Sequence, residues 1–197
     1  NSMELPVKEI VFVPGKNPKF GIFANSLVNQ PAIEEDSVFF NKETNTMFTI
    51  NEESRIIFGP VLIPNKMIFR DNGKEQFNLF ATKETIEAIA IDFAANGRFN
   101  NVNLDHADEL VNDVVIFQSF VTNKNTVPSV KGWEHLEEGT LFQGAKVYND
   151  EVWQGIKAGK YNGWSIHAYL EQNYVDLSLT DNEITTLLKK VFSNEIN

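Results

Sequence analysis

Two residues of this chain, His106 and Ser165, have the types that nucleophilic catalysis needs. A serine hydroxyl is a weak nucleophile until a neighbouring base takes its proton, and histidine is the usual base. Both residues lie in strand-like segments, Asn103-Leu104-Asp105-His106 and Gly163-Trp164-Ser165-Ile166. A fold that brings His106 to Ser165 would therefore make a hydrolase.

The segment around Ser165 alternates between apolar and polar side chains. Read with a period of two, one face carries Trp164, Ile166, Ala168 and Leu170, and the other carries Ser165, His167, Tyr169 and Glu171. The first face belongs to the core, so Ser165 is expected on the accessible face. The alternative is an ordinary surface serine on an amphipathic strand.

His106 follows Leu104 by two residues, so a continuing strand would point it to the edge of the core. A histidine there can be partly buried and kept neutral, as a general base requires. Asp105, Asp108 and Glu109 supply carboxylates nearby. The alternative is a turn histidine capped by its acidic neighbours.

The remaining histidines are His135 and His167. His135 lies in a polar, turn-like stretch and is expected to be solvated. His167 shares the face of Ser165, but side chains two apart on a strand are ~6–7 Å apart, too far for a direct hydrogen bond. A metal site built from His106, neighbouring aspartates and His167 is the competing chemistry. No His-Glu-x-x-His or comparable pattern supports it, so we expect neither metal nor cofactor.

The elements that must position these residues are mostly strands. Strands are expected at residues 9–13, 21–28, 37–40, 47–50, 55–63, 114–121 and 140–148, with one long strand at about 162–177. Every position from Val114 to Phe117 is apolar, so that strand is expected to be covered on both faces.

Three helices are predicted beside the strands. The first presents Ile86, Ile89, Ala90 and Phe93 after an N-cap at Thr82, the second begins near Asp150, and the third is the amphipathic stretch 180–192. This order favours a mainly β, α+β fold: a closed or nearly closed antiparallel β-barrel ringed by helices. We expect one domain over residues 1–197.

Composition excludes several classes of function. The chain has 197 residues, a formal net charge of -10 and no Cys, so thiolate catalysis, disulfides and nucleic-acid binding through clustered basic residues are not expected. No apolar run approaches the ~20 residues that span a bilayer, so we expect no membrane partner.

A colinear set of segments resembles the XkdF-type phage serine protease family, relatives of the prohead maturation proteases. The segments are residues 57–64, 83–86, 101–106, 139–141 and 150–166, the last of which reads Asp-Glu-Val-Trp-Gln-Gly-Ile-Lys-Ala-Gly-Lys-Tyr-Asn-Gly-Trp-Ser-Ile. The resemblance covers roughly residues 55–170, and its last segment is the most specific part.

The resemblance implies an assemblin-like fold, a β-barrel ringed by helices that is shared with herpesvirus maturation proteases. It implies that His106 and Ser165 are the catalytic pair of a serine endopeptidase. It also implies that the substrates are the scaffold protein, the major capsid protein and the chain itself. They would be cut inside the assembling procapsid, in the host cytoplasm. Assemblin-like enzymes dimerise through helices, so a homodimer is a further expectation.

Two departures from the family pattern leave the third catalytic member unassigned. Gln118 stands where an acid often occupies the central strand, and His167 follows the Ser-Ile pair where an acidic residue is usual. The candidates for the third member or orienting group are His167, Glu171, Asp108, Glu109 and Gln118. The alternative function is a catalytically inactive virion or assembly protein that keeps the protease fold.

Overall fold

The computed structural model describes residues 5–10, 12, 22–28, 49–71, 73–104, 109–168 and 174–176. This part is a mixed α+β fold of mostly strands, which confirms the predicted class. Its helices are α1 (Lys83–Ala95) and α2 (Asp150–Lys157), with one 3₁₀ turn, η1 (Arg98–Asn100). Its strands are β1 (Val7–Ile10), β2 (Ile22–Val28), β3 (Thr49–Asn51), β4 (Ile56–Leu62), β5 (Ile68–Asp71), β6 (Gln76–Phe80), β7 (Val102–Leu104), β8 (Val114–Val121), β9 (Leu141–Val147), β10 (Gly163–Ala168) and β11 (Tyr174–Asp176).

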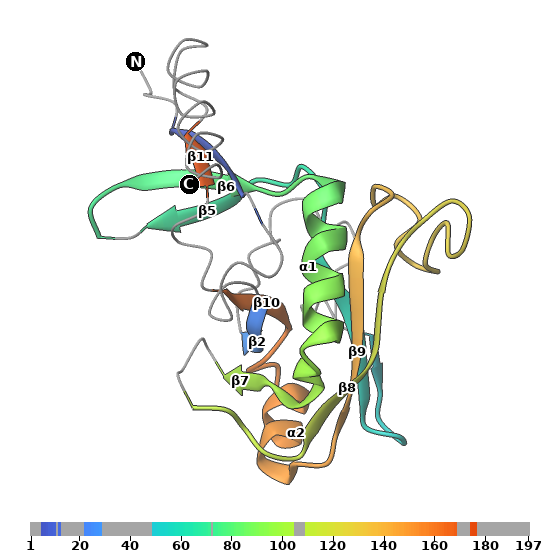
Figure 1. Cartoon of the computed structure of the whole chain (residues 1–197). Coiled ribbons are helices and arrows are strands. Elements are labelled where there is room, and N and C mark those ends of the chain that lie inside the picture. The colour runs from blue at the N-terminus through green and yellow to red at the C-terminus, as the bar shows by residue number, and fades with distance from the viewer. Residues whose placement is uncertain are drawn as a thin grey trace.

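The strands form three sheets, in the orders β11-β1-β6-β5, β10-β2-β7 and β3-β4-β9-β8. Within the described residues none of these sheets closes on itself, so the predicted barrel is not confirmed. The pairs β1–β6 and β2–β7 are parallel, so a wholly antiparallel arrangement is wrong. Figure 1 shows α1 running beside β9 and β8 with β2 on its other side, and α1 contacts all three strands.

Helix α1 follows the predicted pattern. Thr82 accepts a hydrogen bond from the backbone N–H of Thr85 at 3.3 Å and so caps the first turn. Ile86, Ile89 and Phe93 are buried along one face. The helix therefore packs its apolar stripe between two sheets, as its 3.6-residue period requires.

Strand β8 departs from prediction because it contains a bulge. Ile116 pairs with Ala145 and Gln118 pairs with Gly144, which leaves Phe117 without a partner in the register. Phe117 is 52% exposed, so the expected burial of both faces is wrong. A bulge places two residues of one strand opposite a single residue of its partner and re-aims a side chain, and apolar composition does not reveal where this happens.

The predicted strand at 162–177 is two strands in different sheets. β10 pairs with β2, whereas β11 pairs with β1. β5 and β6 were not predicted at all. The predicted strand at 37–40 and the helix at 180–192 lie outside the described residues.

Two apolar groups sandwich the sheet β3-β4-β9-β8. Its inner face belongs to the main core, where Ile57 and Trp164 are buried. On its outer face the rings of Phe58, Phe120 and Phe142 stack at centroid distances of 5.6–6.1 Å, and Trp133 packs edge-on against Phe58 and Phe142. We call these four residues the outer aromatic group.

Candidate active site

Helix α2 begins the segment that leads to Ser165. The Asn149 Oδ1 accepts a hydrogen bond from the backbone N–H of Val152 at 3.0 Å, which caps the first turn. Val152, Trp153 and Ile156 are buried, and the helix packs on β9. The helix is therefore anchored before the chain turns toward β10.

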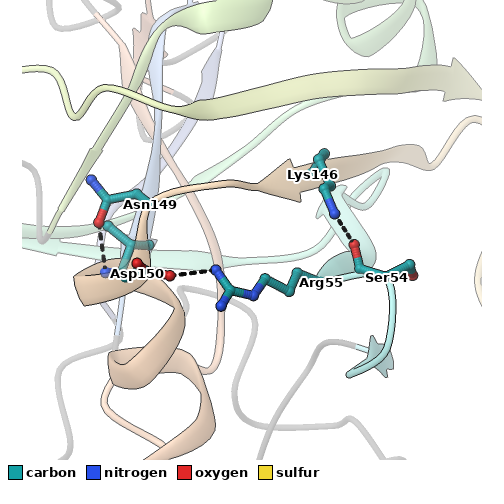
Figure 2. Close-up of polar contacts among 6 residues, drawn as sticks. Ser54, Arg55, Lys146, Asn149 and Asp150 are labelled. Carbon is teal, nitrogen blue, oxygen red and sulfur yellow. Dashed lines mark hydrogen bonds and ion pairs between the residues drawn. The ribbon is translucent and has the colours of Figure 1, made fainter.

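Arg55 ties the start of α2 to the turn between β3 and β4 (Figure 2). Its Nη1 lies 2.6 Å from the Asp150 Oδ1, and its guanidinium carbon lies 6.0 Å from the ring centroid of Trp153. Lys146 of β9 donates a hydrogen bond to the backbone carbonyl of Ser54 in the same turn. Asp150 is 83% exposed, so this ion pair is worth only ~0.2–1 kcal/mol and serves chiefly to orient the helix.

The turn after α2 closes around Gly155. A methyl group at Gly155 would lie 2.7 Å from the Cε2 and 2.9 Å from the Cδ2 of Tyr161, so the aromatic ring occupies the place of a side chain. Gly159 has a φ of 74°, in the left-handed region that ends helices. Tyr161 is buried and directly precedes the residues that enter β10. Gly155 therefore leaves the room that the Tyr161 ring occupies just before β10.

Trp164 holds β10 to β9. Its Nε1 donates a hydrogen bond to the backbone carbonyl of Gln143 at 3.3 Å, and the side chain is 1% exposed. The Gln143 amide is itself buried and donates to the Ser119 Oγ at 3.0 Å. The prediction that Trp164 faces the core is confirmed. The packing of the Trp164 side chain fixes the position directly before Ser165.

The sheet β10-β2-β7 carries both candidate segments. β10, which contains Ser165, pairs antiparallel with β2, and the other neighbour of β2 is β7 in parallel. β7 ends at Leu104, two residues before His106. His106 itself lies outside the described residues. The strand that leads into the histidine segment and the strand of the serine are therefore two members of one sheet.

Two polar residues that sequence reasoning did not single out share a row with Ser165. Ser26 of β2 is the register partner of Ser165, and Asn103 of β7 is the register partner of Ser26. Asn103 stands in the histidine segment, but nothing in the local sequence indicates that β2 lies between β10 and β7. Pairing between strands distant in the chain has no local signal.

The candidates for a third member are spread over several places. His167 lies in β10 in register with Ala24. Glu109 is exposed and directly follows residues 105–108, which lie outside the described part together with Glu171. Among the candidates that the structure describes, His167 is the one on the same strand as Ser165.

Gln118 lies on another sheet. It is exposed in β8, and a methyl group at its register partner Gly144 would overlap the Gln118 Oε1 and lie 3.1 Å from the Cδ2 of Phe58. The Gln118 amide therefore lies over Gly144 beside the outer aromatic group. Trp164 packs in the main core, on the opposite face of the same sheet.

Among the described residues, no group of three or more His, Cys, Asp or Glu side chains could hold a metal ion. Asp105, His106 and Asp108 lie outside this part. Neither described helix has the length and apolar character needed to cross a membrane.

A serine strand in the same sheet as the strand leading to a histidine defines a candidate serine-hydrolase site on an α+β fold. A family model described as "Putative phage serine protease XkdF" matches residues 43–173, more than half of the chain. The chain belongs to this family, which confirms the resemblance seen over residues 55–170. No curated protein and no solved structure matches the chain significantly.

Proposed function

We propose that this protein is a prohead maturation serine protease that cuts scaffold and major capsid proteins, and itself, during phage capsid assembly. Membership of a family named for phage serine proteases supports the class of activity. The observation that carries the assignment to residues is the sheet β10-β2-β7, in which Ser165 and the strand entering the His106 segment are both held.

The proposed reaction is acyl transfer through an ester of Ser165. His106 takes the hydroxyl proton as the Ser165 Oγ attacks the scissile carbonyl, and the resulting imidazolium returns that proton to the leaving amine as the C–N bond breaks. Water then attacks the ester, with His106 again as base, and releases the carboxylic acid product and free Ser165. The cycle needs no cofactor.

For the group that orients His106, we propose His167, which would give the His-Ser-His arrangement of the herpesvirus maturation proteases. Its place on the strand of Ser165 supports this choice. Glu171, Asp108 and Glu109 are the other candidates. Gln118 is the least favoured, because it lies beside the outer aromatic group.

The wider setting is proposed from the resemblance alone. It comprises a single assemblin-like domain over residues 1–197, action inside the procapsid in the host cytoplasm, and a homodimer formed through a helix such as the stretch 180–192. The net charge of -10 supports protein substrates over nucleic acid.

The test is co-expression of the chain with the scaffold and major capsid proteins encoded beside it, followed by intact-mass analysis. Ser165→Ala should lower cleavage at least about 10³-fold, and adding His106→Ala should lower it little further, because such residues act as a unit. Ser129→Ala, an exposed loop serine, is the matched control and should cleave normally. Equal cleavage by Ser165→Ala would refute the mechanism. If the native chain leaves the masses of the scaffold and capsid proteins unchanged, the alternative function as an inactive assembly protein is favoured. Gln118, at a position where the family often has an acid, supports that alternative.

A further inference from the structure

The segment that carries His106 is held at its two ends. Asn103 of β7 and Leu110 form an antiparallel bridge, and the N–H of Val111 donates to the carbonyl of Val102 at 2.8 Å. Val102 and Asn103 are neighbours on β7, and both are 0% exposed. The chain between Asn103 and Leu110 therefore leaves and re-enters the fold at neighbouring points, and the position of the bridge determines where the His106 segment begins and ends.

The chain beyond this bridge is bound to the start of α2 through Asn149. The Asn149 Nδ2 donates to the backbone carbonyl of Asn112 at 3.2 Å, and its backbone N–H donates to the carbonyl of Asp113 at 3.0 Å. The N–H of Tyr148 donates to the same Asp113 carbonyl at 2.8 Å. Figure 1 shows this part of the chain, between β7 and β8, passing beside α2.

Asn149 also caps α2, the helix that leads to Ser165. Its Oδ1 accepts a hydrogen bond from the N–H of Val152 at 3.0 Å, and its backbone carbonyl accepts one from the N–H of Trp153 at 3.0 Å. In Figure 2 the Asn149 oxygen faces the first turn of α2, and the amide nitrogen points away from the helix. The two ends of one amide thus bind two segments. The oxygen holds the helix before the serine strand, and the nitrogen holds the chain after the histidine segment.

We propose that Asn149 is a positioning residue that sets the place of the His106 segment relative to the strand of Ser165, an inference that rests on the proposed function. Asn149 is not proposed to touch the substrate or the reacting atoms, and it acts through the two segments that it joins. Proton transfer from serine to histidine depends on their separation, and a displacement of about 1 Å can cost about 10²-fold in rate. A side chain that joins both segments therefore affects the rate of acylation.

An ordinary helix cap is the competing explanation. Asparagine is among the preferred N-cap residues, and loss of a cap lowers the free energy of unfolding without any catalytic meaning. Aspartate caps a helix as well as asparagine does, but its carboxylate has no N–H to donate to the carbonyl of Asn112. Asn149→Asp therefore keeps the cap and removes the side-chain bond to the histidine side.

The experiment measures the second-order rate at which a fluorophosphonate labels Ser165 in the full chain. The labelled residue is identified by peptide mass, and circular dichroism confirms that each variant is folded. Asn149→Asp and Asn149→Ala should both slow labelling about tenfold, less than the loss that a full ångström can cause. Asn149→Asp should unfold at the higher urea concentration of the two, because it keeps the cap. Glu151→Gln, an exposed carboxyl-to-amide change in the same helical turn, is the matched control and should label at the native rate.

The outcomes separate this inference from the proposed function. A native chain that is not labelled at Ser165 overturns both. If the native chain is labelled and Asn149→Asp is labelled equally fast, the positioning role alone is overturned; a slow Asn149→Ala beside it would then assign Asn149 to capping. Equal slowing of Glu151→Gln would show a general effect of changes in α2 and would also overturn the inference.

Discussion

Replacing Gly155 by Ala tests whether the packing of Tyr161 against α2 determines the path into the serine strand. In an unobstructed helix this change is stabilising by about 0.8–1 kcal/mol, because Ala is the better helix former. Here the added methyl would lie 2.7 and 2.9 Å from two ring atoms of a side chain that is only 4% exposed. Overpacking of this kind costs ~1–3 kcal/mol, and the closeness of both contacts favours the upper part of that range. The net expectation is a loss of about 1–2 kcal/mol.

The assay is urea unfolding followed by circular dichroism, with the midpoint and slope both fitted. The same substitution in a Tyr161→Leu background is the control, because the shortened side chain frees the space and Gly155→Ala should then stabilise the protein. The double-mutant cycle should give a coupling of ~1–3 kcal/mol. Gln154→Ala, an exposed neighbour in the same helix, should change stability by no more than ~0.5 kcal/mol. A Gly155→Ala variant that is about 1 kcal/mol more stable than the native chain would refute the reasoning.

Three further predictions concern polar and aromatic contacts elsewhere in the described structure. Asp150→Asn removes the ion pair to Arg55 and should cost no more than ~1 kcal/mol, with the loss shrinking in 1 M salt during urea unfolding. Trp164→Phe removes a hydrogen bond to β9 and part of a buried ring and should cost ~1–3 kcal/mol by the same assay. Hydrogen bonds from its own backbone N–H and from that of Gly132 hold the pKa of the Glu134 carboxyl below its ordinary value. A lowered pKa stabilises the fold above the unfolded-state pKa, and this contribution disappears as pH falls through the folded-state pKa. NMR titration should show a lower pKa for the Glu134 carboxyl than for a glutamate in an unstructured peptide. Glu134→Gln should remove this contribution to the pH dependence of the free energy of unfolding.

The helices and the central strands could be predicted because their signals are local. α1 has an N-cap at Thr82 and an apolar stripe, α2 places Val152, Trp153 and Ile156 on one face, and β8 has the predicted bounds. The neighbours of each strand could not be predicted in this way. Which edge of β2 receives β10 depends on contacts between residues far apart in the chain, and the bulge at Phe117 depends on its partner strand.

The same difference between local and long-range signals applies to the candidate site. Ser165 can be singled out as a candidate from its own strand, since the alternation with Trp164 is visible in the sequence, and the predicted burial of Trp164 is confirmed. Ser26 could not be found, because its relation to Ser165 exists only through the register of two strands. A serine in an ordinary strand carries no chemical signal by itself. Residue types can therefore indicate a candidate catalytic pair, whereas the neighbours of its strands become visible only in the sheet topology.

Residues 150–166, the last segment of the resemblance, are held at several points before β10 begins. α2 is fixed at its start by Asn149 and Arg55, the ring of Tyr161 fills the place that Gly155 leaves open, and Trp164 reaches β9. Each contact removes one way in which the next residues could move, because the turn between α2 and β10 is only a few residues long. We therefore expect an insertion or deletion of one residue between Gly155 and Trp164 to break the contact of Tyr161 with α2 or to shift the register of β10 on β2.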